Sequence, residues 1–250
     1  MSNETRNRSF IGGGKIYFKE VGAAAAMLEV GNADNFTFAI AEDKKTQRNF
    51  TQKGGGNIAS SSAITDVTAT INALSFQPST LAIALRSLVN TVVAGAVADE
   101  AQIGYVGGFL RLAKLPDITQ TITVTGTGGT PVFVLDTDFT VGNGGIVITE
   151  GGAITDALVL EVTYTAVESY SIQGVTRAAV EYEILFDGFN DADDGKTVLV
   201  QCHKVKFSPS SALDLISEDY GSLPLTFEVL ADTTKNGTSE SQYFEMVMEA

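Results

Sequence analysis

The sequence contains very little of the side-chain chemistry that enzymes and metal sites use most. Its 250 residues include one cysteine, Cys202, one histidine, His203, and no tryptophan. A single cysteine excludes an intramolecular disulfide and a cysteine-based zinc site, and one histidine leaves little for acid–base catalysis. No apolar run reaches the roughly 18 residues that a membrane-spanning helix needs. We therefore expect a non-enzymatic protein with no cofactor, no bound metal and no membrane partner.

Basic residues are also scarce. The chain has 16 Lys and Arg against 30 Asp and Glu, which gives a net charge of −14. An acidic surface repels the phosphate backbone of nucleic acids, so DNA or RNA binding is not expected. The first eight residues are polar and lack the apolar core of a signal peptide, which predicts that the protein is cytoplasmic when it is made.

Strand patterns dominate the sequence. Residues 35–41 and 66–74 alternate between apolar and other side chains, as half-buried strands do. In the second stretch, Thr68, Thr70 and Asn72 lie on the face opposite the apolar residues. These two strands and the longer ones after residue 168 predict a mainly β protein, an antiparallel β-sandwich or barrel.

One helix is expected to flank the sheet, over about residues 78–94. Pro78 suits a first helical turn, and Leu81, Leu85 and Leu88 follow at helical spacing. The pattern ends near Gly95.

Residues 118–167 differ in texture from the rest of the chain. They contain no Lys or Arg, and short Thr- and Val-rich runs alternate with glycine turns. Such runs are typical of a small all-β module. We interpret this stretch as an insertion into a discontinuous core formed by residues 1–117 and 168–250.

The connection over residues 42–62 is too long for an ordinary hairpin loop and carries a cluster of positive charge. Four cations lie within ten residues with no acid between them. Together with Asn49 and Phe50 they are the candidate subunit-interface residues: Lys44, Lys45, Arg48, Asn49, Phe50 and Lys53. Two readings stay open: a solvated loop, or a loop that docks on the acidic surface of another copy.

The sequence fragments that resemble catalytic or binding motifs each lack a feature that the motif requires. Gly195-Lys196-Thr197 ends like a phosphate-binding loop, but a strand follows it where a helix is required, which predicts a hairpin turn. The acidic residues of 187–194 do not have EF-hand spacing. Near His203 the apolar alternation of residues 197–207 slips by one position, which predicts a β-bulge.

Several short segments resemble the major tail, or tail tube, proteins of bacteriophages. They are Phe186-Asp187-Gly188, Asp194-Gly195-Lys196, Val205-Lys206-Phe207-Ser208-Pro209, Leu223-Pro224-Leu225 and Val229-Leu230-Ala231-Asp232. The order of strand, long loop, strand and helix in the N-terminal half is similar as well. The 133–164 stretch looks like a module that such proteins often carry.

The resemblance implies a structural virion protein in the phage tail, assembled in the host cytoplasm. Its members form hexameric rings that stack into a tube and deliver DNA through the lumen without binding it specifically. The implied partners are other copies of the chain, the tape measure, terminator and baseplate proteins, and in some tails a sheath. On this reading Thr68, Thr70 and Asn72 are candidates to face the lumen, and the 42–62 segment reaches between subunits.

Two other classes remain open at this point. A β-sandwich adhesin or carbohydrate-binding module is one, although such modules usually present aromatic platforms and this chain has no Trp and 7 Tyr. A tail terminator, or the tube subunit of a contractile injection particle, is the other. Which tail type the protein serves, and what the insertion does, is not encoded in any motif.

Overall fold

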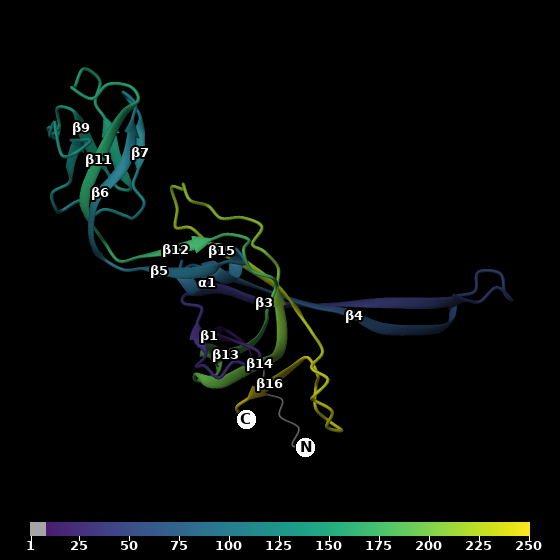
Figure 1. Cartoon of the computed structure of the whole chain (residues 1–250). Helices are drawn as coiled ribbons and strands as arrows, with labels where there is room; N and C mark the ends of the chain where they lie inside the picture. Colours follow the sequence, from purple (N-terminus) through teal and green to yellow (C-terminus); the bar gives the residue numbers. More distant parts are fainter. Residues whose placement is uncertain (1–8) are drawn as a thin grey trace. The chain divides into compact units, whose positions relative to one another are not determined.

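The chain folds into two compact units, and each has its own hydrophobic core. The computed structural model describes residues 9–250. Unit 1 consists of the chain up to Leu88 together with Ile172–Ala250, and unit 2 is Val89–Ser171. The predicted mainly β fold is confirmed, with one α-helix among the described residues (Figure 1). None of the helices in this part of the chain has the length and apolarity to cross a membrane.

Unit 1 is built on an eight-stranded sheet in the order β2-β1-β13-β14-β15-β4-β3, with β16 paired to β14. All of its pairings between adjacent strands are antiparallel. The sheet does not close into a barrel. The elements are β1 (Gly12–Glu20), β2 (Leu28–Glu29), β3 (Ala33–Arg48), β4 (Asn57–Ala73), α1 (Pro78–Ala84), β13 (Glu181–Asn190), the 3-10 turn η1 (Asp191–Asp193), β14 (Lys196–Phe207), β15 (Leu223–Val229) and β16 (Phe244–Met248).

The core of unit 1 lies on one face of this sheet. Strand alternation places Val67, Ala69 and Ile71 of β4 inward, where they meet Ile184 of β13 and Phe227 of β15. Each of these side chains is almost completely buried. The polar residues between them face away from the core.

The predicted bulge near His203 is confirmed. In the β13–β14 pair, Tyr182 lies opposite Val205 and Ile184 lies opposite Cys202, so β14 holds one more residue than β13 between these points. The extra residue lets both halves of β14 keep apolar side chains on the core.

The helix is shorter than predicted. It spans Pro78–Ala84, and the 78–94 extent is wrong because Arg86 adopts a left-handed backbone conformation, with φ of 46°, that stops it. Residues after it form strand β5 (Leu88–Val92), which pairs with β12 (Ser169–Gln173). The apolar residues beyond Leu85 therefore matched the helical spacing without belonging to the helix.

Unit 2 consists of two three-stranded sheets, β7-β10-β9 and β6-β11-β8. Its strands are β6 (Gly95–Gly104), β7 (Phe109–Arg111), β8 (Thr123–Gly126), β9 (Phe139–Gly142), β10 (Gly145–Ile148) and β11 (Leu158–Ala166). The unit begins well before residue 118, where the sequence placed the insertion, because β6 pairs along the length of β11 and β7 pairs with β10. Buried Phe139, Ile146 and Leu160 form the centre of its core.

Candidate assembly interface

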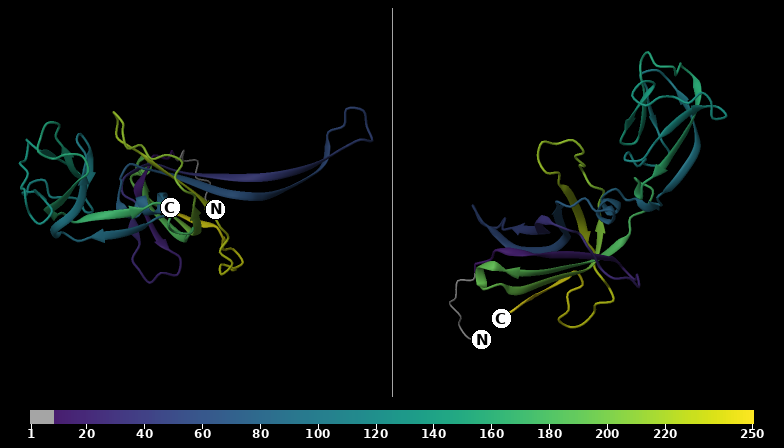
Figure 2. Two further views of the ribbon diagram at one scale, coloured as in Figure 1. Left: turned by 45° about the horizontal axis from the view of Figure 1, so that its top comes forward. Right: turned by 90° about the vertical axis from the view of Figure 1, so that its left-hand side faces the viewer.

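Strands β3 and β4 continue far beyond the core as a two-stranded hairpin (Figures 1 and 2). Within residues 39–66, which we call the arm, every residue except Asn49 and Gly55 is exposed. The predicted loop over 42–62 is therefore wrong: the strands pair as far as Arg48 and Asn57, and only residues 49–56 form a loop. The sequence did not predict these strands because residues 42–48 are charged or polar and residues 57–62 are mostly Ser and Ala, so neither stretch shows apolar alternation.

The base of the arm is held by aromatic packing and a bulge. Phe36 and Phe38 of β3 pack on the core, where Phe38 stacks on Phe244 of β16 with ring centroids 5.2 Å apart. Three residues further along β3, after Ala41, the register shifts and Thr65 is the extra residue of β4. The Thr65 hydroxyl donates to the Ala41 carbonyl at 3.3 Å. Bulges of this kind bend and twist a ribbon, so this one sets the direction of the arm.

The tip of the arm is an ordered turn that presents Phe50. The Asn49 side-chain oxygen accepts from both the amide and the hydroxyl of Thr51, at 2.9 and 2.6 Å. The Asn49 amide donates to Gly56, and the Arg48 guanidinium donates to Gly55. Phe50 contributes no contact to this network and is 86% exposed. The turn therefore holds an aromatic ring in solvent at the end of the arm.

The arm carries unpaired cations on both of its faces. Residues that lie opposite one another in an antiparallel pair share a face, and successive residues alternate. Lys44, opposite Ser62, therefore lies on one face and Lys45, opposite Ser61, on the other. Neither of these lysines, nor Lys53, has an ion-pair partner within residues 9–250.

Exposed aliphatic side chains lie among these cations. The sequence pattern placed Ile40 on the apolar face of residues 35–41, with Phe36 and Phe38, and gave no role to Ile58 and Ile64. Ile40, Ile58 and Ile64 are each more than half exposed. An isolated two-stranded ribbon is marginally stable in water, and exposed apolar side chains on it mark a contact surface. Ile58 and Ile64 stand singly within a stretch rich in Ser and Ala, which gives no apolar alternation.

The outer edge of β3 is open as well. β3 pairs with β4 alone, so along Ala33–Arg48 its other edge has no strand partner in the described part of the chain. Unpaired backbone donors and acceptors on a long edge are a template for pairing with another strand. The arm thus offers backbone, apolar and charged contacts together.

A family model described as "Protein of unknown function UCP028589" matches residues 9–247. The chain belongs to this family. Among curated proteins, no match to the chain is found.

The three predicted lumen candidates share one polar face of β4, opposite the core. Thr70 lies within 3.5 Å of the Thr226 hydroxyl, Asn72 donates to the Asp34 carboxylate at 2.8 Å, and Thr68 donates to the Ala39 carbonyl. All three are half-buried. They form a neutral strip of short polar side chains between β3 and β15.

Cys202 and His203 do not form a reactive pair. The Cys202 side chain is completely buried, and burial raises the pKa of its thiol to about 12, so it is protonated at neutral pH. His203 is buried beside it at the bulge, and its amide donates to Tyr243. Among the described residues no cluster of three or more metal-ligating side chains is found, including the acidic turn at 187–194.

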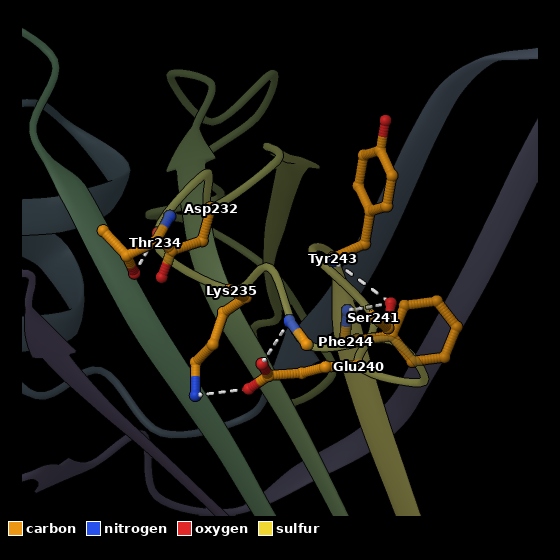
Figure 3. Close-up of polar contacts among 8 residues, drawn as sticks. Asp232, Thr234, Lys235, Glu240, Ser241, Tyr243 and Phe244 are labelled. Atoms are coloured by element: carbon orange, nitrogen blue, oxygen red, sulfur yellow. Dashed lines mark hydrogen bonds and ion pairs between the residues drawn. The ribbon is translucent and has the colours of Figure 1, made fainter.

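The segment between β15 and β16 is held by polar contacts among its own residues (Figure 3). Asp232 accepts from the amide and hydroxyl of Thr234, and these hydrogen bonds lower the pKa of its carboxyl group. Glu240 pairs with Lys235 at 3.1 Å and accepts from Gly237, which lowers the pKa of Glu240. Closer to β16, the Ser241 hydroxyl accepts from the backbone amides of Tyr243 and Phe244, at 3.2 and 3.4 Å.

Proposed function

We propose that the protein is a non-enzymatic structural subunit that assembles with copies of itself into stacked hexameric rings, as the tube of a bacteriophage tail. The observation that carries this proposal is the arm. Two long strands leave the core and expose isoleucines, unpaired lysines and the ring of Phe50 to solvent. Such a surface is costly to keep free in water and is explained by a partner that covers it.

A second copy of the chain is the partner that charge favours. The distal part of the arm, residues 44–65, contains four of the sixteen basic residues and none of the thirty acidic ones. The remainder of the protein is strongly acidic, so most of the surface of another copy attracts the basic arm. Because the arm and the surface it would contact are different, the contact is heterologous, and such contacts build rings or open filaments.

The polar face of β4 fits the same proposal. Thr68, Thr70 and Asn72 offer no positive charge, and their short side chains are already engaged with neighbouring strands. A lumen lined in this way lets DNA slide past, because nothing on it attracts phosphate. The similarity of the C-terminal strands to tail tube proteins supports the same assignment.

Assembly of a protein with a shortened arm tests the proposal. Asp43 and Ala63 lie opposite each other in the hairpin, so replacing residues 44–62 with Asn-Gly closes the ribbon with a two-residue turn. We expect the wild type to form rings and tubes in negative-stain micrographs when concentrated, and the shortened protein to stay monomeric with unchanged thermal unfolding. A wild type that stays monomeric, or a shortened protein that forms normal tubes, contradicts the proposal.

A further inference from the structure

A second exposed apolar surface lies in the loop that joins β14 to β15. Within residues 214–220, Leu215 is 82% exposed, Ile216 is 97% exposed and Tyr220 is fully exposed. Single exposed apolar residues are ordinary on protein surfaces. Three large ones within six positions, with none covered by the chain itself, indicate a contact surface.

The two ends of this loop are fixed to unit 1, so the loop holds its apolar residues at a defined place on the surface. The Ser210 amide donates to Ala84 at 2.8 Å, and its hydroxyl donates to the Pro224 carbonyl at 3.1 Å. Leu213 packs against the core, and Gly221 lies close to the ring of Phe76. Between these anchors the loop has an internal hydrogen bond, from the Asp219 amide to the Ser217 hydroxyl at 3.1 Å.

The charge of the loop is the opposite of the charge on the arm. Asp214, Glu218 and Asp219 alternate with its apolar residues, and no Lys or Arg occurs between positions 207 and 234. The arm combines isoleucines and Phe50 with four cations and no acid over residues 44–65. The two surfaces therefore match in both apolar character and charge sign, and charge pairs of this kind set register and partner choice.

The two surfaces do not cover each other within one chain. Phe50 and Ile216 are both largely exposed, which excludes a contact between them in the same molecule. The arm extends roughly 25 Å beyond the core, at about 3.3 Å per residue over the paired residues 41–48. It is therefore long enough to reach a surface on a neighbouring molecule.

We propose that the 214–220 loop of one copy is the surface that receives the arm of a second copy. In this contact Leu215, Ile216 and Tyr220 cover apolar side chains of the arm, and carboxylates of the loop pair with lysines on the face of the arm that meets it. The proposal rests on the proposed function, because it names the partner surface for arm-driven assembly. Since the loop and the arm are different surfaces, each copy offers one of each, and the contact repeats from copy to copy.

Charge exchange between the two surfaces tests the proposal. The Lys44→Glu/Lys45→Glu variant and the Glu218→Lys/Asp219→Lys variant should each raise the protein concentration needed for assembly by about tenfold or more. The four substitutions together restore the wild-type net charge and the opposite signs, so we expect assembly to return. The control is Glu150→Lys/Glu168→Lys, which changes the charge equally at exposed positions of unit 2 and should assemble as the wild type does.

Disulfide trapping gives a readout that does not depend on complete tubes. When the Gln52→Cys protein is mixed with the Ile216→Cys protein and mildly oxidised, we expect a covalent heterodimer. The native thiol at 202 does not compete because it is buried and protonated. Pairing Gln52→Cys with Val175→Cys, an equally exposed position elsewhere in unit 1, should give little product.

The outcomes separate this inference from the proposed function. If the wild type assembles and the shortened arm abolishes assembly, but the loop variant behaves like the unit 2 control and no heterodimer forms, the loop is not the receiving surface and the proposed function stands. If the wild type never assembles, both the proposed function and the pairing of the arm with the loop are wrong. Recovery in the four-substitution protein together with the heterodimer supports the pairing.

Discussion

Phe38 of β3 stacks on Phe244 of β16 with an interplanar angle of 26°, and this contact lies where the arm leaves the core. Beyond Phe38 the side chains of β3 are exposed, whereas Ala33, Phe36 and Phe38 are half-buried and pack against the core. The stack joins the arm to the last strand of the chain. It thereby connects the proposed assembly element to the stability of unit 1.

Removing this stack should weaken the base of the arm. Phe244 is partly buried, so Phe244→Ala should lower the free energy of unfolding by about 1–3 kcal/mol, less than for a fully buried phenylalanine. Urea unfolding followed by circular dichroism measures the change, and Phe244→Leu serves as the conservative control. Hydrogen exchange in residues 39–66 should also rise in the alanine variant. An unchanged exchange rate would show that the stack does not position the arm.

Phe50 should matter for assembly and not for folding. Its ring is exposed at the tip, so Phe50→Ser should leave the free energy of unfolding within about 0.5 kcal/mol of wild type. The concentration needed for assembly should rise, because the apolar contact at the end of the arm is lost. Sedimentation velocity over a concentration series measures this. A matched substitution at another exposed apolar position, Val132→Ser in unit 2, should leave assembly unchanged.

The neutral strip on β4 should be intolerant of positive charge if it faces a lumen. Thr68→Lys with Thr70→Lys should leave the tube intact and slow DNA delivery, since lysine attracts the phosphate backbone. Infectivity of phage carrying the variant, with tube integrity checked in micrographs, measures the effect. Thr155→Lys on the exposed surface of unit 2 is the control. Normal delivery through intact tubes would remove this face from the lumen.

Tyr164 should titrate later than an ordinary tyrosine. Burial, and then the hydrogen bond that its hydroxyl donates to Glu100 at 2.7 Å, raise its pKa from 10.0 to about 12. Because the folded pKa lies above the unfolded one, the stabilisation is complete below pH 10 and is lost as the pH rises from 10 to about 12. An absorbance titration of tyrosinate should show this late step. Tyr164→Phe should lower its amplitude by one tyrosine, and Tyr182, whose pKa burial also raises, contributes the remainder. Ionisation of every tyrosine near pH 10 would contradict the assignment.

The two cores should unfold as separate units. Leu160→Ala lies in the core of unit 2 and Ile184→Ala in that of unit 1, and each should lower the stability of its own unit by about 2–5 kcal/mol. Scanning calorimetry should then show one transition shifted and the other in place. A single transition that moves equally in both variants would mean that the units unfold cooperatively.

The amino-acid pattern alone was enough to predict the β class, the polar face of β4 and the bulge at His203. These depend on strand alternation, which a single strand records in its own residues. The mostly negative charge and the scarcity of His and Cys are likewise properties of composition. The basic cluster at residues 44–53 was also visible, because charge does not depend on the backbone that carries it.

Other features depend on contacts between residues that are distant in sequence, which alternation does not record. Residues 42–48 and 57–62 are strands because they pair with each other. Alternation could not predict them, since 42–48 are charged or polar and 57–62 are mostly Ser and Ala. The helix ends at Ala84 although the leucine spacing continues, because Arg86 is left-handed and the residues after it pair as β5 with β12. Unit 2 starts at Val89 and not at residue 118, because β6 pairs with β11, which lies more than fifty residues later in the chain. Only the folded chain showed that Leu215 and Ile216 remain uncovered, because burial depends on residues that are distant in sequence.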